Sequence, residues 1–405
     1  MKIGIIKETK IPVDNRVALT PCQVALLNKQ YPEHQIVVQS SDVRAYTDEE
    51  YLQNGVEIVD NVNDCDILFG IKEARIDTLI PNKHYIFFGH IAKMQPYNRP
   101  LLQSMIKKHL TFTDYEYLVD DNNTRVCAFG WWAGVVGVYY TLRGYGLKTK
   151  SYHLPKPDID FTLDELLKNL CAVSLPAVKI LITGNGRVSR GAQYVMERIN
   201  AQQLNEKEFL SPNQVDSLSF AVANAESLVK RTDGGIFNAN EFKTTPQNYY
   251  SDFMRWAKVT DILICAHYWA ANAPVYLTAD DLVNTELEIK MIGDITCDIK
   301  GSIHSTIRST THSEPYYDYN PVTKAEEIAF SDNNNISVMA VDTCPNALPR
   351  DTSKYFGEML IEHVFIPLLQ GVNSSVINRA TILKEGELTE RFSYLNDFAF
   401  GEKNI

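Results

Sequence analysis

Short apolar runs recur along the first third of the chain, and longer mixed stretches separate them. The runs are rich in Ile, Val, Leu and Phe and have the length of buried β-strands; they cover residues 2–7, 35–39, 66–72, 85–90 and 110–116. The stretches between them, such as residues 21–29, are long enough for helices. Because strands that alternate with helices are typical of βαβ units, the pattern predicts a parallel sheet covered by helices.

A second series of the same kind occupies the rest of the chain. Its apolar runs cover residues 177–183, 257–265, 289–294 and 336–342. Residues 151–160, which carry two prolines, and the polar residues 230–248 are expected to be loops. A last helix is expected over residues 352–369, after Pro349. The length of the chain also suggests two domains, so we predict an α/β protein with two of them.

The run at residues 177–183 leads into the sequence TGNGRVSRGA, in which Gly184 and Gly186 precede a helical stretch. Glycines between a buried strand and a helix let the backbone approach a pyrophosphate, which binds the N–H groups at the helix N-terminus. The third glycine of the usual Gly-x-Gly-x-x-Gly pattern is replaced by Ser189, and Gly191 follows two residues later. The motif predicts a dinucleotide site, with an ordinary strand-to-helix turn as the alternative.

The overall composition excludes some classes of partner. A net charge of −11 and a pI near 5.4 argue against nucleic acid, whose phosphates require a basic face. Seven scattered cysteines without a Cys-x-x-Cys pair predict reduced thiols and neither a disulfide framework nor a metal site. The N-terminal MKIGIIKETK is too short in apolar residues for a signal peptide, so we expect a cytoplasmic protein.

Residues 126–142 carry no charged side chain, and arginines flank them on both sides. A helix that crosses a bilayer needs about 20 apolar residues, which is longer than this segment. The segment also contains Gly130, Gly134 and Gly137. We therefore predict a buried helix between the domains, in which small residues permit close packing, and no membrane association.

Ionisable residues stand at the ends of three predicted strands. Lys72 and Glu73 stand at the end of the run at residues 66–72. His90 ends the run at residues 85–90, and Glu116 ends the run at residues 110–116. Open α/β sheets place their ligand groups at such carboxyl ends. Burial or a nearby cation can lower the pKa of a lysine or histidine there into the range useful for proton transfer. A solvated Lys72–Glu73 pair and an ordinary loop histidine are the alternatives, but three such ends in one domain favour a site.

Arginines and acids near other strand ends extend this set. Arg16 follows the first strand, and Arg125 precedes the charge-free segment; either could bind a carboxylate through its planar fork or be a surface charge. Asp294 and Asp298 follow a later strand. They could face a cofactor, or they could cap a turn and lie in solvent.

Several motifs together resemble one known family. They are NRVALTP, FGIKEA, FFGH, DYEYL, RVCAFGWWAG, TGNGRVSRGAQ, CAHYWAANAP, GDITCDIKGSI and DTCPNALP. Their order and spacing from Met1 to about Leu369 resemble lysine-forming saccharopine dehydrogenase. The chain is more distantly similar to alanine dehydrogenase and to the soluble part of nicotinamide nucleotide transhydrogenase. The alanine branch usually has asparagine where this chain has Thr343.

The resemblance implies two Rossmann-like domains with parallel sheets and an active-site cleft between them. Residues 1–134 with residues 350–405 would form the substrate domain, and residues 135–349 the dinucleotide-binding domain. The implied reaction is the reversible oxidative deamination of saccharopine to L-lysine and 2-oxoglutarate, with hydride transfer to or from NAD or NADP. The sequence predicts no particular oligomeric state.

The resemblance also assigns residues to roles. Lys72 would accept the proton of the secondary amine, His90 would serve as acid and base in imine hydrolysis, and Glu73 and Glu116 would tune these two groups. Arg16, Arg125 and Phe129 would bind the substrate, Phe129 beside the nicotinamide. The implied cofactor-binding residues are Gly184, Gly186, Arg187, Val188, Ala266, His267, Tyr268, Asp298 and Leu348.

The choice between NAD and NADP stays open. An acid that binds the ribose is expected about 20 residues beyond the glycines, but the sequence there reads EFLSP, with Ser211 in that place. Lys230 and Arg231 could bind a 2′-phosphate or be solvated loop charges.

Two other functions remain as alternatives. One is an alanine dehydrogenase-like enzyme that uses ammonia in place of lysine. The other is a catalytically silent, nucleotide-binding regulator, which the presence of Lys72, Glu73, His90 and Glu116 argues against.

Overall fold

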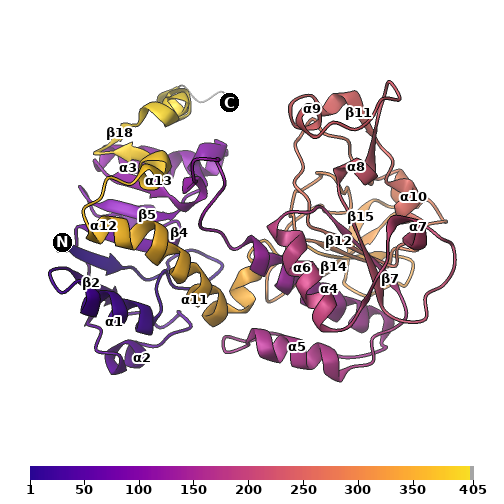
Figure 1. Ribbon diagram of the computed structural model, residues 1–405, viewed down its shortest axis with the longest axis horizontal. Helices are drawn as coiled ribbons and strands as arrows, with labels where there is room; N and C mark the ends of the chain where they lie inside the picture. The colour runs from indigo at the N-terminus through magenta and orange to yellow at the C-terminus, as the bar shows by residue number, and fades with distance from the viewer. Residues whose placement is uncertain (402–405) are drawn as a thin grey trace. The chain divides into compact units, whose positions relative to one another are not determined.

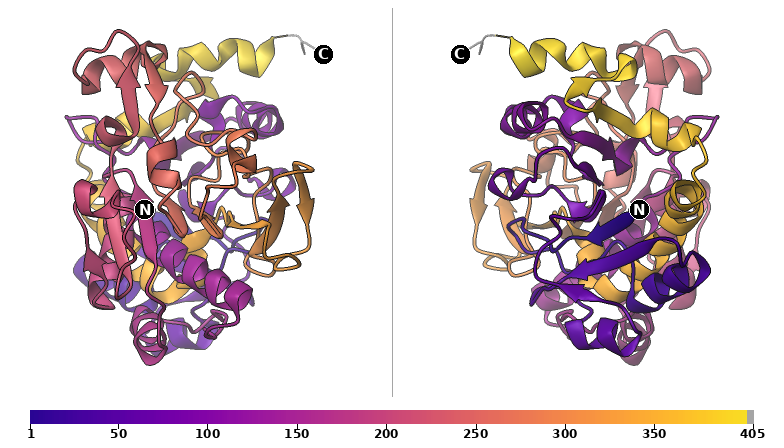
Figure 2. Two further views of the ribbon diagram at one scale, coloured as in Figure 1. Left: turned by 90° about the vertical axis from the view of Figure 1, so that its right-hand side faces the viewer. Right: turned by 90° about the vertical axis from the view of Figure 1, so that its left-hand side faces the viewer.

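The computed structural model describes residues 1–401 of the chain. They form two compact units: unit 1 contains residues 1–129 and the chain from residue 348 onward, and unit 2 contains residues 130–347. Figure 1 shows the C-terminal helices beside the N-terminal strands of unit 1, and the right-hand view of Figure 2 shows the same arrangement from the side of unit 1. In its core the ring of Phe365 stacks on that of Phe69, with centroids 4.3 Å apart. The two ends of the chain therefore build one unit together.

Unit 1 contains an eight-stranded sheet with the order β18-β17-β6-β5-β4-β1-β2-β3. Strands β1 to β6 pair in parallel, whereas β17 and β18 run antiparallel to their neighbours. The strands are β1 (Lys2–Ile5), β2 (Gln35–Gln39), β3 (Ile58–Val59), β4 (Ile67–Lys72), β5 (His84–Phe88), β6 (Thr111–Asp114), β17 (Thr381–Lys384) and β18 (Glu387–Leu388).

All strands predicted in the first third of the chain are present, but three of them end early, among them β1, which ends at Ile5 and not at residue 7. Strand β5 ends at Phe88 and β6 ends at Asp114. His90 and Glu116 therefore lie in the turns beyond these strands and not at their last positions. His90 has a left-handed backbone conformation, with φ of 53°, which stops the strand.

The helices of unit 1 are α1 (Pro21–Gln30), α2 (Asp48–Gln53), α3 (Arg99–Lys107), α11 (Pro349–Leu360), α12 (Ile366–Leu369), α13 (Ser375–Ala380) and α14 (Asn396–Phe400). The predicted start of the last long helix at residue 352 was wrong. Helix α11 begins at Pro349, because the fixed φ of proline suits the first helical position and its missing N–H has no partner to lose there. A π-helical turn, Ile361–Phe365, joins α11 to α12.

Unit 2 contains a second eight-stranded sheet, with the order β15-β14-β16-β13-β12-β7-β9-β8. Six of its strands pair in parallel, and β14 and β15 are antiparallel. The strands are β7 (Lys179–Thr183), β8 (Gln202–Gln203), β9 (Ser219–Ala223), β12 (Ile262–Cys265), β13 (Met291–Asp294), β14 (Tyr316–Asn320), β15 (Ala325–Glu327) and β16 (Ile336–Met339). The prediction of an α/β chain with largely parallel sheets is confirmed.

The helices of unit 2 are α4 (Gly130–Thr149), α5 (Leu163–Ala172), α6 (Arg187–Arg198), α7 (Glu206–Phe209), α8 (Ala225–Leu228), α9 (Ala239–Thr244) and α10 (Met254–Ala257). Residues 230–248 are not a plain loop as predicted, because they contribute to the antiparallel pair β10 (Val229–Arg231) and β11 (Tyr249–Ser251) and contain α9. Residues 151–160 form the expected loop.

The charge-free segment forms most of α4, which packs closely against α6. A Cβ atom on Gly134 would lie 1.9 Å from the carbonyl oxygen of Val188, and one on Gly191 would lie 1.9 Å from the carbonyl oxygen of Trp131. The small residues therefore permit the close packing that the sequence predicts. Among the described residues, no helix has both the length and the apolar character that a membrane crossing requires.

Candidate active site

The proton-transfer residues predicted from sequence lie together at one edge of the unit 1 sheet. Lys72 is the last residue of β4 and Glu73 follows it, while His90 and Glu116 come just after β5 and β6. Because β4, β5 and β6 are neighbouring parallel strands, their carboxyl ends meet at the same edge. The topology thus brings four residues from distant parts of the sequence to one place.

Glu116 is the centre of a network of ion pairs. Its Oε2 lies 3.3 Å from Nδ1 of His90, and its Oε1 lies 3.2 Å from Nζ of Lys93 and 3.1 Å from a terminal nitrogen of Arg125. Burial works to raise the pKa of Glu116, but the hydrogen bond with His90 and the charges of Lys93 and Arg125 outweigh it and lower that pKa to about 2. Glu116 is therefore a carboxylate held beside the ring of His90.

Lys72 lies in surroundings that favour its neutral form. Burial lowers its pKa, and the positive charges of Arg16 and Lys10 lower it further. The adjacent Glu73 forms an ion pair with Lys10, whose Nζ is 2.5 Å from Oε1. The other oxygen of Glu73 is buried and has no hydrogen-bond partner among the described residues. The arrangement suits a lysine that acts as a base.

Arg16 is held rigidly within unit 1. It is only 3% exposed, and its guanidinium forms two hydrogen bonds with Asp14, of 2.9 and 2.5 Å. It also lies over the ring of Phe129, 4.2 Å from the centroid, and that ring stacks on Phe356. Burial acts against ionisation of Asp14, yet Arg16 dominates and the pKa of Asp14 is lowered. In the part of the chain that the structure describes, Nη1 of Arg16 makes no hydrogen bond, so it can still bind a ligand carboxylate.

In unit 2 the glycine turn has the geometry that a pyrophosphate requires. Gly184 has a φ of +88°, and a Cβ atom there would lie 2.7 Å from the carbonyl oxygen of Ala266. Gly186 is the N-cap of α6 and is exposed, and a Cβ atom on it would meet nothing within 4 Å. The first turn of α6, with exposed Arg187 and half-buried Val188, is thus open to an anion.

The two other small residues of the motif have different tasks. Ser189 is fully buried, and its hydroxyl accepts a hydrogen bond from the side chain of Gln193. Gly191 faces α4, as described above. The departure from Gly-x-Gly-x-x-Gly therefore leaves the open start of α6 unchanged.

The end of β12 carries the next group of predicted cofactor residues. The ring nitrogens of His267 lie 2.6 Å from the hydroxyl of Thr183 and 2.7 Å from that of Ser302. Burial lowers the pKa of His267 to about 4, so the ring is neutral. Ala266 is buried, whereas Tyr268 is 90% exposed.

The last two predicted cofactor residues come from other segments of the chain. Asp298 is half-buried in the turn after β13, beyond the fully buried Asp294, whose carboxylate accepts hydrogen bonds from the hydroxyls of Thr296 and Thr306. Leu348 belongs to unit 1 and is completely buried at the start of α11.

The strand end expected to face the ribose was placed wrongly in the sequence. Ser211 lies beyond α7 and ends no strand, because the strand that pairs with β7 is β9, which ends at Ala223. The residue at this position is Asn224, whose side chain caps α8 by accepting a hydrogen bond from the N–H of Ser227. The run SFAVA in the sequence was the available signal, and the 20-residue offset missed it because α7 and its loops lengthen the connection.

The two basic residues considered for a 2′-phosphate have other partners. Arg231 forms ion pairs with Asp233 and Glu241, and Lys230 forms one with Asp252. Both stabilise the β10–β11 pair and its surroundings.

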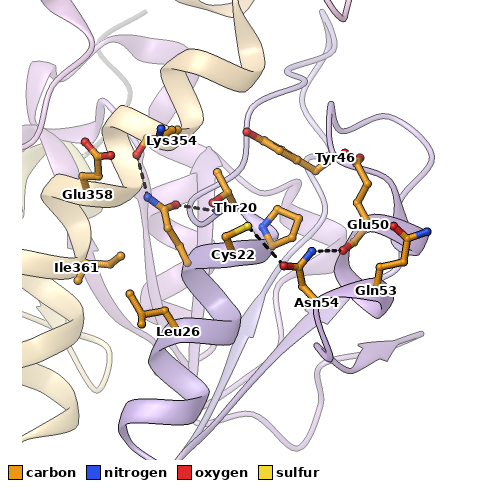
Figure 3. A pocket seen from close by; sticks show the side chains of 12 residues that line it. Thr20, Cys22, Leu26, Tyr46, Glu50, Gln53, Asn54, Lys354, Glu358 and Ile361 are labelled. Carbon is orange, nitrogen blue, oxygen red and sulfur yellow. Dashed lines mark hydrogen bonds between the residues drawn. The ribbon is translucent and has the colours of Figure 1, made fainter.

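A separate hollow of about 630 Å³ lies on unit 1 where α1, α2 and α11 meet (Figure 3). Cys22, Tyr46, Glu50 and Lys354 are among its lining residues. None of the predicted site residues lines it. Among the described residues, no group of three or more His, Cys, Asp or Glu side chains is placed to hold a metal ion.

The chain is similar to several known proteins. Residues 4–136 match the family model of the alanine dehydrogenase/PNT N-terminal domain. The chain is 27% identical to the alpha-aminoadipic semialdehyde synthase of Arabidopsis thaliana, over 97% of this chain and 41% of that protein, and 27% identical to the mitochondrial one of Rattus norvegicus, over 97% and 47%. It is 24% identical to the saccharopine dehydrogenase [NAD(+), L-lysine-forming] of Yarrowia lipolytica, over 95% and 96%. The chain is therefore similar over most of its length to proteins named alpha-aminoadipic semialdehyde synthase and saccharopine dehydrogenase.

The fold agrees as well. A solved structure of L-alanine dehydrogenase superimposes with a TM-score of 0.67 at 18% identity, covering 98% of this chain and 100% of that one. The resemblance seen in the sequence is thereby confirmed, and dehydrogenase relatives imply a nicotinamide cofactor. The chain spans less than half the length of the alpha-aminoadipic semialdehyde synthases that it matches.

Proposed function

We propose that this chain catalyses the reversible oxidative deamination of saccharopine to L-lysine and 2-oxoglutarate with NAD or NADP. The observation that carries the proposal is the convergence of Lys72, whose pKa is lowered, with the His90–Glu116 pair at one sheet edge. The names of the relatives at 24–27% identity support the choice of substrate. Unit 1 would bind the substrate and unit 2 the dinucleotide.

The residues of unit 2 fit a dinucleotide, because Gly186 leaves the start of α6 open and Gly184 lets the turn before it pass directly against the backbone of Ala266. Gly184, Gly186, Arg187 and Val188 would hold the pyrophosphate, and the residues from Ala266 to Tyr268 with Asp298 would contact the rest of the cofactor. When bound, the nicotinamide ring exchanges a hydride with the substrate.

The protein's own groups would then manage the protons. Neutral Lys72 accepts the proton of the secondary amine as its Cα–H bond breaks, and Glu73 moderates the charge that Lys72 gains. His90 removes a proton from the water that adds to the imine. It returns this proton to the nitrogen of the departing product, free L-lysine, as the carbinolamine collapses. Glu116 stabilises His90 while it is protonated. Arg16 and Arg125 bind carboxylates and Phe129 lies beside the reacting carbon, which orients the substrate.

The assay that tests this proposal uses lysine, 2-oxoglutarate and either NADH or NADPH, and follows nucleotide oxidation. We expect turnover with at least one nucleotide and much less when ammonia replaces lysine and pyruvate replaces 2-oxoglutarate. Turnover with ammonia and pyruvate alone would instead establish the alanine dehydrogenase-like alternative. Nucleotide binding with no turnover of either pair would establish the silent regulator.

Arg16 offers a test of carboxylate binding. We expect Arg16→Lys to raise the Michaelis constant for 2-oxoglutarate about 10- to 100-fold, since a hydrogen bond to a charged group contributes about 1.5–3 kcal/mol. Lysine can still neutralise Asp14 but cannot form the planar fork. The matched control is Arg350→Lys, because Arg350 pairs with Glu50 and lies over Tyr46 in the same way outside the site. An unchanged Michaelis constant would remove Arg16 from substrate binding.

Asn224 offers a test of nucleotide choice. We expect Asn224→Asp to raise the ratio of the NADPH to the NADH Michaelis constant at least about tenfold, because a like-charge contact with the 2′-phosphate costs several kcal/mol. A carboxylate also binds the ribose hydroxyls of NADH. Asn224→Ser is the control, since serine keeps a cap for α8 without adding charge. Equal ratios in both variants would place the ribose elsewhere.

A further inference from the structure

Strand β4 loses its regular pairing just before Lys72. On one side the register with β1 ends at Phe69, whose carbonyl accepts a hydrogen bond from the N–H of Ile6. On the other side the register with β5 shifts between Phe69 and Lys72. The N–H groups of Ile71 and Lys72 therefore need an acceptor outside the ladder.

The side chain of Glu8 supplies that acceptor. Its Oε1 accepts from the N–H of Ile71 at 2.6 Å, and its Oε2 accepts from the N–H of Lys72 at 2.9 Å. Gly70 permits this approach, because a Cβ atom there would lie 3.3 Å from Oε1 of Glu8 and 3.2 Å from the side chain of Ile6. One carboxylate thus takes the place of a strand partner for two successive residues.

Asp114 does the same at the neighbouring strand ends. It is fully buried, and the pairing of β5 with β6 ends at Asp114 itself. Its Oδ2 accepts from the N–H of Gly89 at 3.2 Å, and its Oδ1 accepts from the N–H of Glu116 at 2.9 Å. The segments that carry His90 and Glu116 are therefore tied to a single side chain.

We propose that Glu8 and Asp114 are positioning residues of the candidate active site. Glu8 fixes the backbone from which Lys72 projects, and Asp114 fixes His90 and Glu116 relative to each other. Neither carboxylate needs to touch the substrate. The inference rests on the proposed roles of Lys72, His90 and Glu116.

The charges around these groups are consistent with their role. Burial, together with the carboxylate of Asp14, raises the pKa of Glu8, while the two N–H groups and Arg16 oppose this rise. Burial raises the pKa of Asp114 to about 7, against the N–H groups of Glu116 and Gly89. The backbone N–H groups offset part of each rise, and an amide of the same shape would present a donor where an acceptor is needed.

Glu8→Gln tests the first half of the proposal. We expect kcat to fall about 10- to 100-fold, since misplacing a reacting group by an ångström has an effect of that size. We also expect the pH midpoint for modification of Lys72 by an amine-reactive reagent to rise, because the side chain of Lys72 becomes less buried. Loss of negative charge alone would lower that midpoint, so a lower or unchanged midpoint overturns the role of Glu8.

The modification experiment needs no substrate, so it separates the two proposals. A wild-type protein without turnover would count against the proposed function, and an unchanged Lys72 midpoint in Glu8→Gln would count against the positioning role. If Glu8→Gln does not fold, Gly70→Ala displaces the same carboxylate and should raise the midpoint by a smaller amount.

Asp318→Asn is the control for loss of a buried carboxylate outside the site. Asp318 is fully buried and accepts hydrogen bonds from Ser331 and Ser337 in unit 2, so only the stability should fall.

A double-mutant cycle tests the second half. We expect Asp114→Asn to lower kcat about tenfold or more, in line with the cost of misplaced catalytic groups. If Asp114 acts through Glu116, the double variant Asp114→Asn/Glu116→Gln should be no slower than Glu116→Gln alone. Fully additive losses would show that Asp114 acts independently of Glu116 and would overturn its positioning role.

Discussion

The variant Lys72→Met is expected to lower kcat with lysine and 2-oxoglutarate by about two to four orders of magnitude, which is the usual contribution of general acid–base catalysis. Methionine fills much of the same volume but cannot accept a proton. Because the predicted nucleotide-binding residues of unit 2 are unchanged, the Kd for the nucleotide should change little. Steady-state kinetics and a nucleotide titration measure the two quantities.

The pH dependence gives the same variant a second signature. The pKa of Lys72 lies below the ordinary 10.5 through burial and the charges of Arg16 and Lys10. Saccharopine oxidation requires the neutral side chain of Lys72 as the base. The kcat/KM for saccharopine oxidation should therefore rise with pH and level off above the pKa of Lys72. Lys72→Met should lose this rise. The control is Lys354→Met, which removes an exposed lysine of α11 in the same unit. Wild-type turnover in Lys72→Met would exclude Lys72 from the mechanism.

The sequence could predict that the central residues of the candidate site lie together, because their positions follow from the topology. An apolar run followed by an ionisable residue marks a strand end, and parallel neighbours bring such ends together. Lys72, His90 and Glu116 were found in this way, and the structure places His90 and Glu116 in contact.

The residues that support them were missed for a physical reason. Lys10, Asp14 and Lys93 are charged residues in loops and short turns, where most charges are simply solvated. Glu73, the partner of Lys10, is 63 positions away in the sequence. The other charged residues meet their partners through turns that leave no pattern in the sequence. Only the folded loops show that these charges meet.

The antiparallel strands were missed because their sequences do not look buried. Strand β14 reads YYDYN, and its Asp318 would be unfavourable in a sheet interior without partners. The structure supplies them: the hydroxyl of Ser337 donates to Asp318 at 2.5 Å, and Lys148 lies 4.0 Å away. A buried polar cluster of this kind is visible only after the strands are paired.

Replacing Gly191 by alanine is expected to destabilise unit 2 strongly, although alanine normally favours a helix over glycine by about 1 kcal/mol. The added Cβ atom would lie 1.9 Å from the carbonyl oxygen of Trp131, so two helix backbones must separate to admit it. Overpacking usually costs about 1–3 kcal/mol and occasionally more, and a backbone clash belongs at the upper end. We expect Gly134→Ala to behave alike, because its Cβ atom would meet the carbonyl oxygen of Val188 at the same distance.

The free energy of unfolding, measured in urea, should therefore fall by about 3 kcal/mol or more in each variant, the upper part of the range for overpacked cores. Gly130→Ala on α4 is the matched control at the same pair of helices, since its Cβ atom would lie 3.4 Å from the Cβ of Arg187, an ordinary contact. That variant should be as stable as the wild type or slightly more stable. If Gly191→Ala matched the control, α4 and α6 could not be packed with their backbones in contact. The turn that carries Gly184 and Gly186 would then lack the support of the helix pair that follows it.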